Sequence, residues 1–274
     1  MKTSQKIIKY LALALALFLI VTIIFSIMAG LYGIYQVFNF KIEPRVIKYK
    51  EKSCVKTKNI KSLDIKLDYG NLEIIKGEAF KMESSYKNVT CINNYGKVTI
   101  RMNNKFNFKN KRVSLKVYIP SNVKLDEIKA ENNFGKTNIE YLNAKKVDLD
   151  FEAGKTKIKD IVSDSTNIDI ETGLFEVENG TMKNVNFDSG VGKSEITSRI
   201  IGTSKFDTGI GSLSLNLIGN SNNYKIMVDK GIGNVKIDGV STNDNSVNGN
   251  GNNIIDINSG IGEIYVNYIK DVKD

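Results

Sequence analysis

Two stretches, "FDSGVGKSEI" (187–196) and "FDTGIGSLSL" (206–215), share one pattern and begin 19 residues apart. On both sides of a Gly-x-Gly turn, apolar residues alternate with polar ones, which is typical of half-buried strands. Related stretches return at 228–237 and 257–266. One such unit is too short to bury its own apolar face, so a fixed period of about 20 residues predicts a solenoid of stacked units.

The last glycine of each turn marks the repeat. From Gly135 to Gly211 these glycines recur every 19 residues, and an aliphatic residue stands four positions after each of them. Because glycine adopts positive φ without a steric penalty, we expect these residues at the corners between strands. The predicted turn glycines are Gly70, Gly96, Gly135, Gly154, Gly173, Gly192, Gly211, Gly233 and Gly262.

The repeat predicts an all-β, single-domain β-solenoid (β-helix) over residues 60–270, with coils of about 19 residues. Stacked at the spacing of paired strands, about ten coils would make a rod roughly 45–50 Å long. "VTCINNYGKVTI" (89–100) matches "IKAENNFGKTNI" (128–139) and is expected to be one such unit, with "RVSLKVYIP" (112–120) another. An antiparallel sandwich of hairpins is the alternative, which the equal spacing disfavours.

Positions at and near the turns carry expectations about burial. The residue between paired glycines is expected to point into the corner of the core. These residues are Val191, Ile210, Ile232 and Ile261. Cys91 matches Ala130, an inward position, and either a buried thiol or a disulfide with Cys54 fits this placement. The polar loop 239–253 breaks the period and is either decoration or a contact site.

A long apolar segment precedes the repeat. From Leu11 to Phe38 no residue is charged. An apolar helix of about 24 residues crosses the hydrocarbon layer of a bilayer, whereas a cleaved signal peptide has a shorter apolar region. Three lysines before the segment favour a cytoplasmic N-terminus. The expected divisions are a cytoplasmic stub (1–10), a transmembrane signal anchor (11–38), a basic juxtamembrane linker (39–59) and an extracellular β-solenoid (60–270).

Charge is divided unevenly along the chain, whose net charge is +9. Ser84–Leu125 contains nine Lys or Arg and no acid, whereas 126–274 carries a net charge of −7. If the coils stack in sequence order, the basic stretch lies nearest the bilayer, where anionic lipid headgroups or wall polymer would attract it. A solvated basic face is the alternative, and nucleic acid is not an expected partner. The candidate contacts are Lys97, Arg101, Lys105, Lys109, Lys111 and Arg112.

Composition excludes several kinds of chemistry. The chain has no His and two Cys, which excludes Ser-His-Asp and Cys-His catalysis and zinc sites built on His or four Cys. "GVGKS" (190–194) lacks the spacing of a phosphate-binding loop and is expected to be a repeat corner. We expect no catalytic residue, metal or cofactor.

Acidic residues before the turns raise the possibility of calcium binding. They are Glu152, Glu171, Asp188, Asp207 and Asp229. In calcium-binding β-rolls the aspartate follows the glycines, whereas here the acid precedes them. We therefore expect these side chains to close the turns through Asx-type hydrogen bonds.

Three further segments follow the apolar one in a familiar order. They are "LDIKLDYGNLEI" (63–74), "LKVYIP" (115–120) and "LDEIKAENNFGKTNI" (125–139). The arrangement resembles the bacterial putative-adhesin family of membrane-anchored envelope β-solenoids, common in Gram-positive bacteria, whose function is unknown. Some members lie beside envelope-stress signalling systems. The resemblance implies an envelope role and supplies no functional residues.

Together these features predict a non-enzymatic cell-envelope protein that presents a solenoid surface for binding. The role would be adhesin-like or associated with envelope stress, with an envelope protein as a possible partner. The alternative is a polysaccharide-modifying β-helix enzyme. A cleft lined by three or more converging Asp, Lys or Arg side chains would favour the enzyme, and a smooth rod would favour binding.

Overall fold

The structure is a computed structural model that describes residues 15, 18, 19, 22, 50–51, 60–102 and 113–270 of the chain. The chain divides into two units, Met1–Val46 and Ile47–Asp274. The predicted anchor, residues 11–38, lies almost entirely outside the described residues. Among the residues that the structure describes, no helix is long and apolar enough to cross a membrane.

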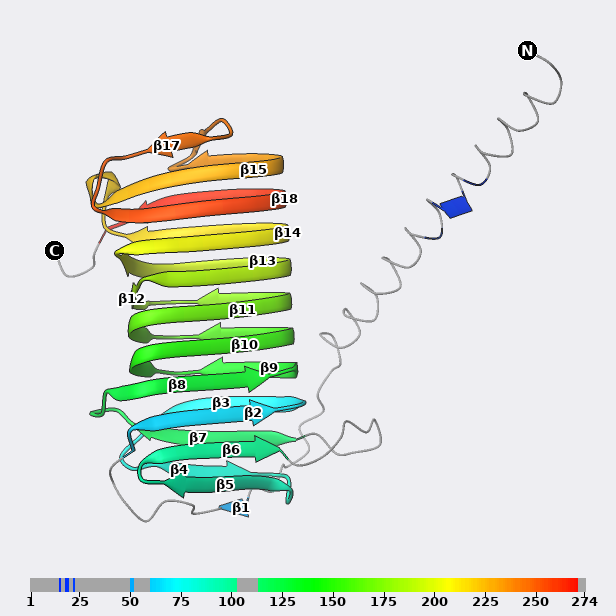
Figure 1. Cartoon of the computed structure of the whole chain (residues 1–274), viewed down its shortest axis with the longest axis vertical. Coiled ribbons are helices and arrows are strands. Elements are labelled where there is room, and N and C mark those ends of the chain that lie inside the picture. Colours follow the sequence, from blue (N-terminus) through cyan, green and yellow to red (C-terminus); the bar gives the residue numbers. More distant parts are fainter. Residues whose placement is uncertain are drawn as a thin grey trace. The chain divides into compact units, whose positions relative to one another are not determined.

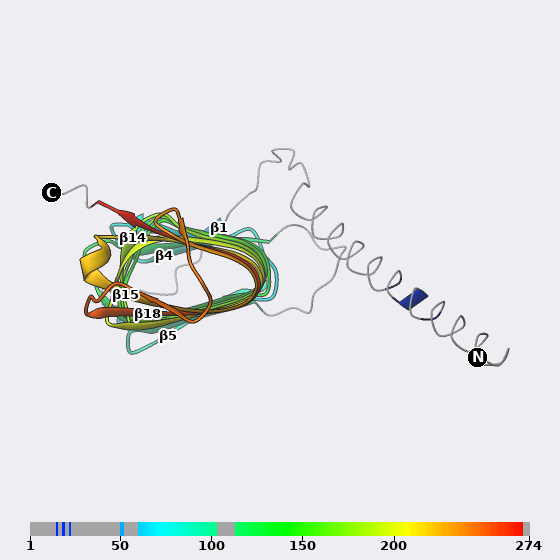
Figure 2. The ribbon, with the colours of Figure 1, turned by 90° about the horizontal axis from the view of Figure 1, so that it is seen from above.

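The second unit is a stack of flattened coils (Figure 1), which superimpose when the stack is seen from its end (Figure 2). Its one short helix within the described ranges is η1 (Ser221–Asn223). The strands are β1 (Lys50–Glu51), β2 (Ser62–Leu67), β3 (Gly70–Gly77), β4 (Lys81–Ser84), β5 (Val89–Asn94), β6 (Lys97–Met102), β7 (Ser114–Pro120), β8 (Leu125–Asn132), β9 (Phe134–Ile139), β10 (Leu142–Ile158), β11 (Ile161–Val177), β12 (Gly180–Lys183), β13 (Val185–Ile201), β14 (Thr203–Ile218), β15 (Tyr224–Ile237), β16 (Val240–Ser241), β17 (Ser246–Asn248) and β18 (Asn253–Ile269).

Successive coils pair in parallel and in one register, so that each turn glycine lies over the next. Gly154 pairs with Gly173, and Gly192 pairs with Gly211. Long strands such as β10 and β11 run through the corner without a break. The parallel pairing confirms the predicted all-β stack and excludes the antiparallel sandwich for these coils.

The layers do not follow the order of the sequence at either end. β2 lies between β6 and β8, and β18 lies between β14 and β15. The predicted in-order stacking is therefore wrong at both ends. From one end to the other the layers are β6–β7, β2–β3, β8–β9, β10, β11, β12–β13, β14, β18 and β15. The chain steps over a layer at residues 121–124, between β7 and β8, and again at residues 219–223, between β14 and β15. Residues 238–252 then lead back from β15 to the interior strand β18.

Antiparallel strands cover both ends of the stack. β5 pairs with β6, and β4 pairs with β7 and β1 at one end, while β16 and β17 pair with β15 at the other. Such strands cover exposed strand edges, whose unpaired backbone groups could otherwise pair with a strand of another molecule. Residues 89–100 therefore form a hairpin, not the predicted solenoid unit, and Gly96 lies in its tight turn beside Tyr95, at φ values of 93° and 51°. The predicted unit at 112–120 is confirmed, because β7 pairs in parallel with β3.

Alternate side chains of each strand fill the interior. The rings of Phe175, Phe187 and Phe206, from three successive layers, pack against one another at a tilt, with centroids 5.6 and 5.8 Å apart. Buried aromatic rings at this spacing contribute packing energy beyond their area alone. Because equivalent residues recur in register, the core is a set of columns that run along the stack.

At the corner, the expectation for the residue between paired glycines is wrong. Val191, Ile210, Ile232 and Ile261 are exposed and do not enter the core. The glycines on both sides pack against the neighbouring layer, which turns the residue between them outward. A Cβ on Gly209 would lie 2.5 Å from the carbonyl oxygen of Gly190, and a Cβ on Gly211 would lie 1.8 Å from that of Gly192.

Candidate functional site

A column of aspartates runs along one outer face of the stack. Each member stands four residues before its turn glycine, so the parallel register places the side chains side by side at about 4.8 Å. The aspartate column consists of Asp150, Asp169, Asp188 and Asp207, followed by Asn258 and Asp229 in the last two layers.

Three consecutive carboxylates of this column lack a cationic partner. Asp150, Asp169 and Asp188 form no ion pair with any residue that the structure describes. Burial, followed by the nearby charges of Asp150 and Asp188, raises the pKa of Asp169 above its ordinary value. The column thus concentrates negative charge with no direct ion pair at Asp150, Asp169 or Asp188, although Lys66 and Lys205 interact at longer range with Asp150 and Asp188.

Several other acids on the rod are paired with lysines of neighbouring segments. Lys145 contacts Asp126 at 2.7 Å, and Lys146 contacts Glu127 at 3.0 Å. Glu131 bonds to Lys66 and Lys129; burial opposes its ionisation, but these hydrogen bonds outweigh burial and lower its pKa. Lys124 and Lys183 both contact Asp164. The aspartate column differs from these paired acids in having three neighbouring carboxylates in a row without an ion pair among the described residues.

A shallow groove of about 370 Å³ opens beside the column in the last layers. Asp188, Asp207 and Asp229 line one part of it, with Asn258 and Gly260. Asp207 accepts a 2.8 Å hydrogen bond from Asn258 and contacts Lys205. Gly209 and Gly260 line the groove, which exists because these positions have no side chain. The carboxylate oxygens of the groove can accept hydrogen bonds from a ligand and attract cations.

The groove does not have the form of a catalytic cleft. Its three aspartates are equivalent residues of neighbouring layers on one open face, whereas carboxylate pairs in glycosidases flank the scissile bond. Within the described residues, no group of three or more Asp, Glu, Cys or His could hold a metal ion. The arrangement can attract and bind charge, but it presents no pair of dissimilar groups for acid and base roles.

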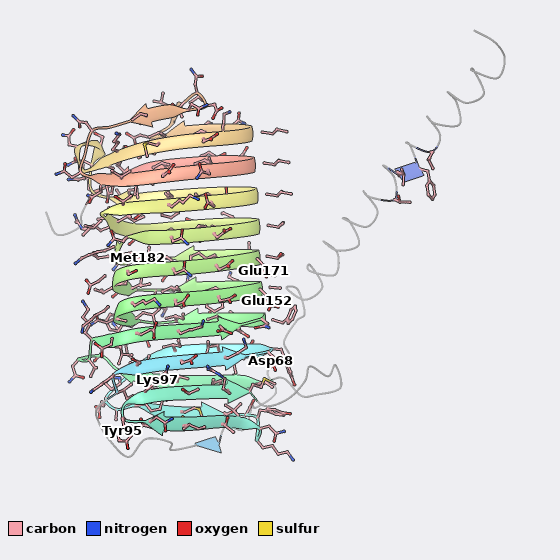
Figure 3. All side chains as sticks on the ribbon, in the orientation of Figure 1. Asp68, Tyr95, Lys97, Glu152, Glu171 and Met182 are labelled. Atoms are coloured by element: carbon pink, nitrogen blue, oxygen red, sulfur yellow. The ribbon has the colours of Figure 1, made fainter. Side chains whose placement is uncertain are left out.

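Register also separates two kinds of acid that the sequence grouped together. Glu152 and Glu171 stand two residues before their glycines, at the corner, whereas Asp188 and its equivalents stand four residues before. Figure 3 shows Asp68, Glu152 and Glu171 along one edge of the stack. Counting back four from every turn glycine would have found Asp150 and Asp169, which the sequence analysis missed.

The predicted basic contacts are only partly described. Lys97 is exposed in the terminal layer, and Figure 3 shows it near one end of the stack beside Tyr95. Arg101 instead holds two layers together, because its guanidinium bonds both carboxylate oxygens of Asp64, at 2.8 and 2.5 Å. The other four predicted contacts, Lys105, Lys109, Lys111 and Arg112, lie outside the described residues.

The other predictions resolve more simply. Eight turn glycines, all those predicted except Gly96, occupy solenoid corners with φ between 128° and 159°. Residues 190–194 form a repeat corner, as expected. Cys91 is disulfide-bonded, and Cys54 lies outside the described residues. No hydrogen bond described for Asp188 or Asp207 is an Asx-type closure of its own turn.

Comparison with known families identifies the chain. The family model "Toastrack DUF4097" matches residues 59–274, which include every coil of the solenoid. The chain belongs to the toastrack family. No curated protein matches it.

Several solved structures are similar to this toastrack protein. A putative cell adhesion protein from Clostridium sporogenes is 16% identical, with 81% of this chain and 99% of that chain covered and a TM-score of 0.39. A putative adhesin from Bacteroides fragilis is 12% identical, covering 82% and 99%, with a TM-score of 0.39. A putative lipid binding protein from Parabacteroides distasonis is 12% identical, covering 81% and 96%, with a TM-score of 0.32.

Proposed function

We propose that this toastrack protein is a single-pass membrane protein whose solenoid lies outside the cell and binds a cationic partner without catalysing a reaction. The uncharged segment 11–38 would be the anchor. The disulfide of Cys91 supports the outside location, because disulfides persist in exported domains and are rare in the cytosol. The role is adhesin-like or associated with envelope stress.

The aspartate column carries the binding part of the proposal. Burial, together with the neighbouring like charges, makes ionisation of the column costly, and both raise the pKa of Asp169. A cationic ligand would remove this cost, and a repeat of about 4.8 Å suits an extended partner that offers several positive groups in a row. A polysaccharide-modifying enzyme is less well supported, because the three aspartates of the groove do not converge across a cleft.

The basic end of the rod offers a separate contact with anionic headgroups or wall polymer. Although the stacking order differs from the expected one, β6–β7 is still the terminal layer, so Lys97 still lies at one end. β1 pairs with β4 at this same end, and only residues 39–49 separate β1 from the apolar segment. This proposal would place the basic end toward the bilayer and leave the aspartate column accessible.

Binding of a lysine-rich peptide by the full chain in nanodiscs tests the proposal. We expect salt-sensitive binding that Asp169→Asn with Asp188→Asn weakens at least fivefold. Glu178→Gln is the matched control, because Glu178 already contacts Lys157 and lies away from the column. Equal binding of a glutamate-rich peptide, or no effect of the double substitution, would contradict the proposed partner chemistry.

A further inference from the structure

An exposed apolar ridge runs along the edge of the stack through its last four layers. Its members stand directly before the turn glycines, and the register pairs each with the next. Their exposures lie between 41% and 72%. The apolar ridge consists of Val191, Ile210, Ile261 and Ile232, in spatial order. Single exposed apolar residues are common, but four neighbours at strand spacing form a continuous patch.

Glycines on both sides make the ridge protrude. Ile210 stands between Gly209 and Gly211, and its three equivalents are flanked in the same way. None of these glycines can take a side chain without meeting the backbone of the next layer; a Cβ on Gly260, for example, would lie 2.6 Å from the oxygen of Gly209. The outward direction of the ridge is therefore set by backbone packing.

Nearer the middle of the stack, the same edge separates two sets of opposite charge. Glu152 and Glu171 stand just before the corner, at the edge shown in Figure 3. Lys136, Lys155 and Lys193 stand just after it, each following its turn glycine, and the register places them in one column in which Leu174 separates Lys155 from Lys193. Within the described chain, Lys136, Lys155, Glu152 and Glu171 form no ion pair. The edge thus has an acidic side and a basic side.

We propose that this edge binds a second copy of the same chain, with the two rods parallel and related by a two-fold axis along their length. Such an axis exchanges the two sides of the edge, so Lys155 of one copy meets Glu152 of the other at the same layer. It also places each ridge residue against its own equivalent. An antiparallel pair would instead bring lysines against lysines, which like-charge repulsion disfavours.

Parallel packing also agrees with the membrane anchoring that we propose above. The inference rests on that proposal for the common orientation and the high local concentration of the two copies. Two copies anchored in one membrane point the same way, and confinement raises their effective concentration. The contact is a narrow strip along one edge, whereas stable interfaces bury about 1,200 Å² or more. We therefore expect pairing in the membrane and little dimerisation of dilute protein.

Cysteine cross-linking of the full chain in native membranes tests the pairing. Val191→Cys, Ile210→Cys and Ile232→Cys should each form a homodimer on mild oxidation, at a yield at least tenfold above that of Ser165→Cys. Ser165 is the matched control because it is exposed on a face of β11, away from the corner, and its substitution is nearly isosteric. An antiparallel pair would overturn the proposal by linking Val191→Cys to Ile232→Cys in mixed membranes and neither residue to itself.

Charge reversal gives a second readout that misfolding cannot imitate. In the Ile210→Cys background, Lys155→Glu should lower the cross-linking yield several-fold, and adding Glu152→Lys should restore it, because opposite charges then meet again at that layer. Failure of the rescue, or ridge yields equal to that of Ser165→Cys, would overturn the proposal. Labelling the same cysteines on intact cells with an impermeant maleimide tests the outside location separately, so the two proposals fail independently.

Discussion

Gly211 pairs with Gly262, although Gly233 is much closer in the sequence and lies one layer farther out. The C-terminal strand β18 is thus an interior layer, with β14 on one side and β15 on the other. An interior strand contributes two ladders of hydrogen bonds, whereas a terminal one contributes a single ladder. The C-terminal region should therefore matter more to stability than its position in the sequence indicates.

Truncation tests the role of β18. A chain ending at Gly251 should lose amide-exchange protection throughout β15 and partly along β14, because both strands lose the neighbour that they share. A chain ending at Lys270 keeps β18 and should retain the protection. Unchanged protection of β15 in the shorter chain would show that β14 and β15 can pair directly.

Substitution at a corner tests the packing of the glycines. Gly192→Ala should lower the free energy of unfolding by more than about 3 kcal/mol, because its Cβ would lie 1.9 Å from the carbonyl oxygen of Gly173 at a φ of 152°. Gly239→Ala is the control, since Gly239 has φ 79° with no atom within 4 Å of its Cβ, and should cost about 1 kcal/mol. Urea denaturation measures both; equal losses would contradict close packing at the corner.

The stability contributions of Asp169, in the aspartate column, and Asp164, outside it, should depend on pH in opposite directions. The pKa of Asp169 is raised from an ordinary 3.8 in the folded protein. The folded state is therefore favoured while Asp169 is protonated, below pH 3.8, and this contribution to stability is lost as pH rises through the raised pKa. Asp169→Asn should therefore raise the melting temperature at pH 7 and leave it nearly unchanged at pH 3. The corresponding gain in the free energy of unfolding at pH 7 should be less than about 1 kcal/mol.

Asp164 provides the comparison of opposite sign. Hydrogen bonds from Lys124 and Lys183 lower the pKa of Asp164, so its contribution is present above its ordinary pKa and lost as pH falls through the lowered one. Asp164→Asn should lower the melting temperature at pH 7 and lose this effect in acid. Melting curves of both variants between pH 3 and pH 7 measure the difference; the same sign for both would refute the assignment.

Vesicle binding distinguishes free basic residues from structural ones. In a soluble chain lacking residues 1–40, Lys97→Ala should weaken binding to anionic vesicles by about 1 kcal/mol at low salt. Lys236→Ala, on an exposed lysine at the other end of the rod, should have no effect. Arg101→Ala should lower thermal stability because Asp64 loses its partner. Co-sedimentation measures binding, and equal binding to neutral vesicles would reject the headgroup contact.

The regular part of the fold follows directly from the sequence. Equal spacing from Gly135 to Gly211 is enough to predict the parallel register, because a constant period places equivalent residues side by side. The ends could not be predicted in this way. Periodicity identifies a unit but does not indicate which of its two edges the next unit will occupy, and β2 and β18 each receive neighbours on both edges.

The surface was less predictable for two physical reasons. Alternation assigns faces along a straight strand, but at the corner two closely packed glycines turn Ile210 outward, and the alternation fails there. Composition also cannot show which charges are neutralised, because Arg101 pairs with Asp64, which is distant in the sequence and lies in a neighbouring layer. The members of the aspartate column share their distance from the turn glycine, and this distance, not the local sequence, identifies them.

The constant register between β10 and β14 has a consequence for the evolution of the rod. Residues 161–179 form one complete unit, and the residues of this unit pair with equivalent positions in the layers on both sides. An in-frame duplication or loss of such a unit would therefore keep all columns aligned and change the length by about 4.8 Å. The crossed layers at both ends would remain as they are. The length of the rod can thus evolve in small equal steps without a new fold.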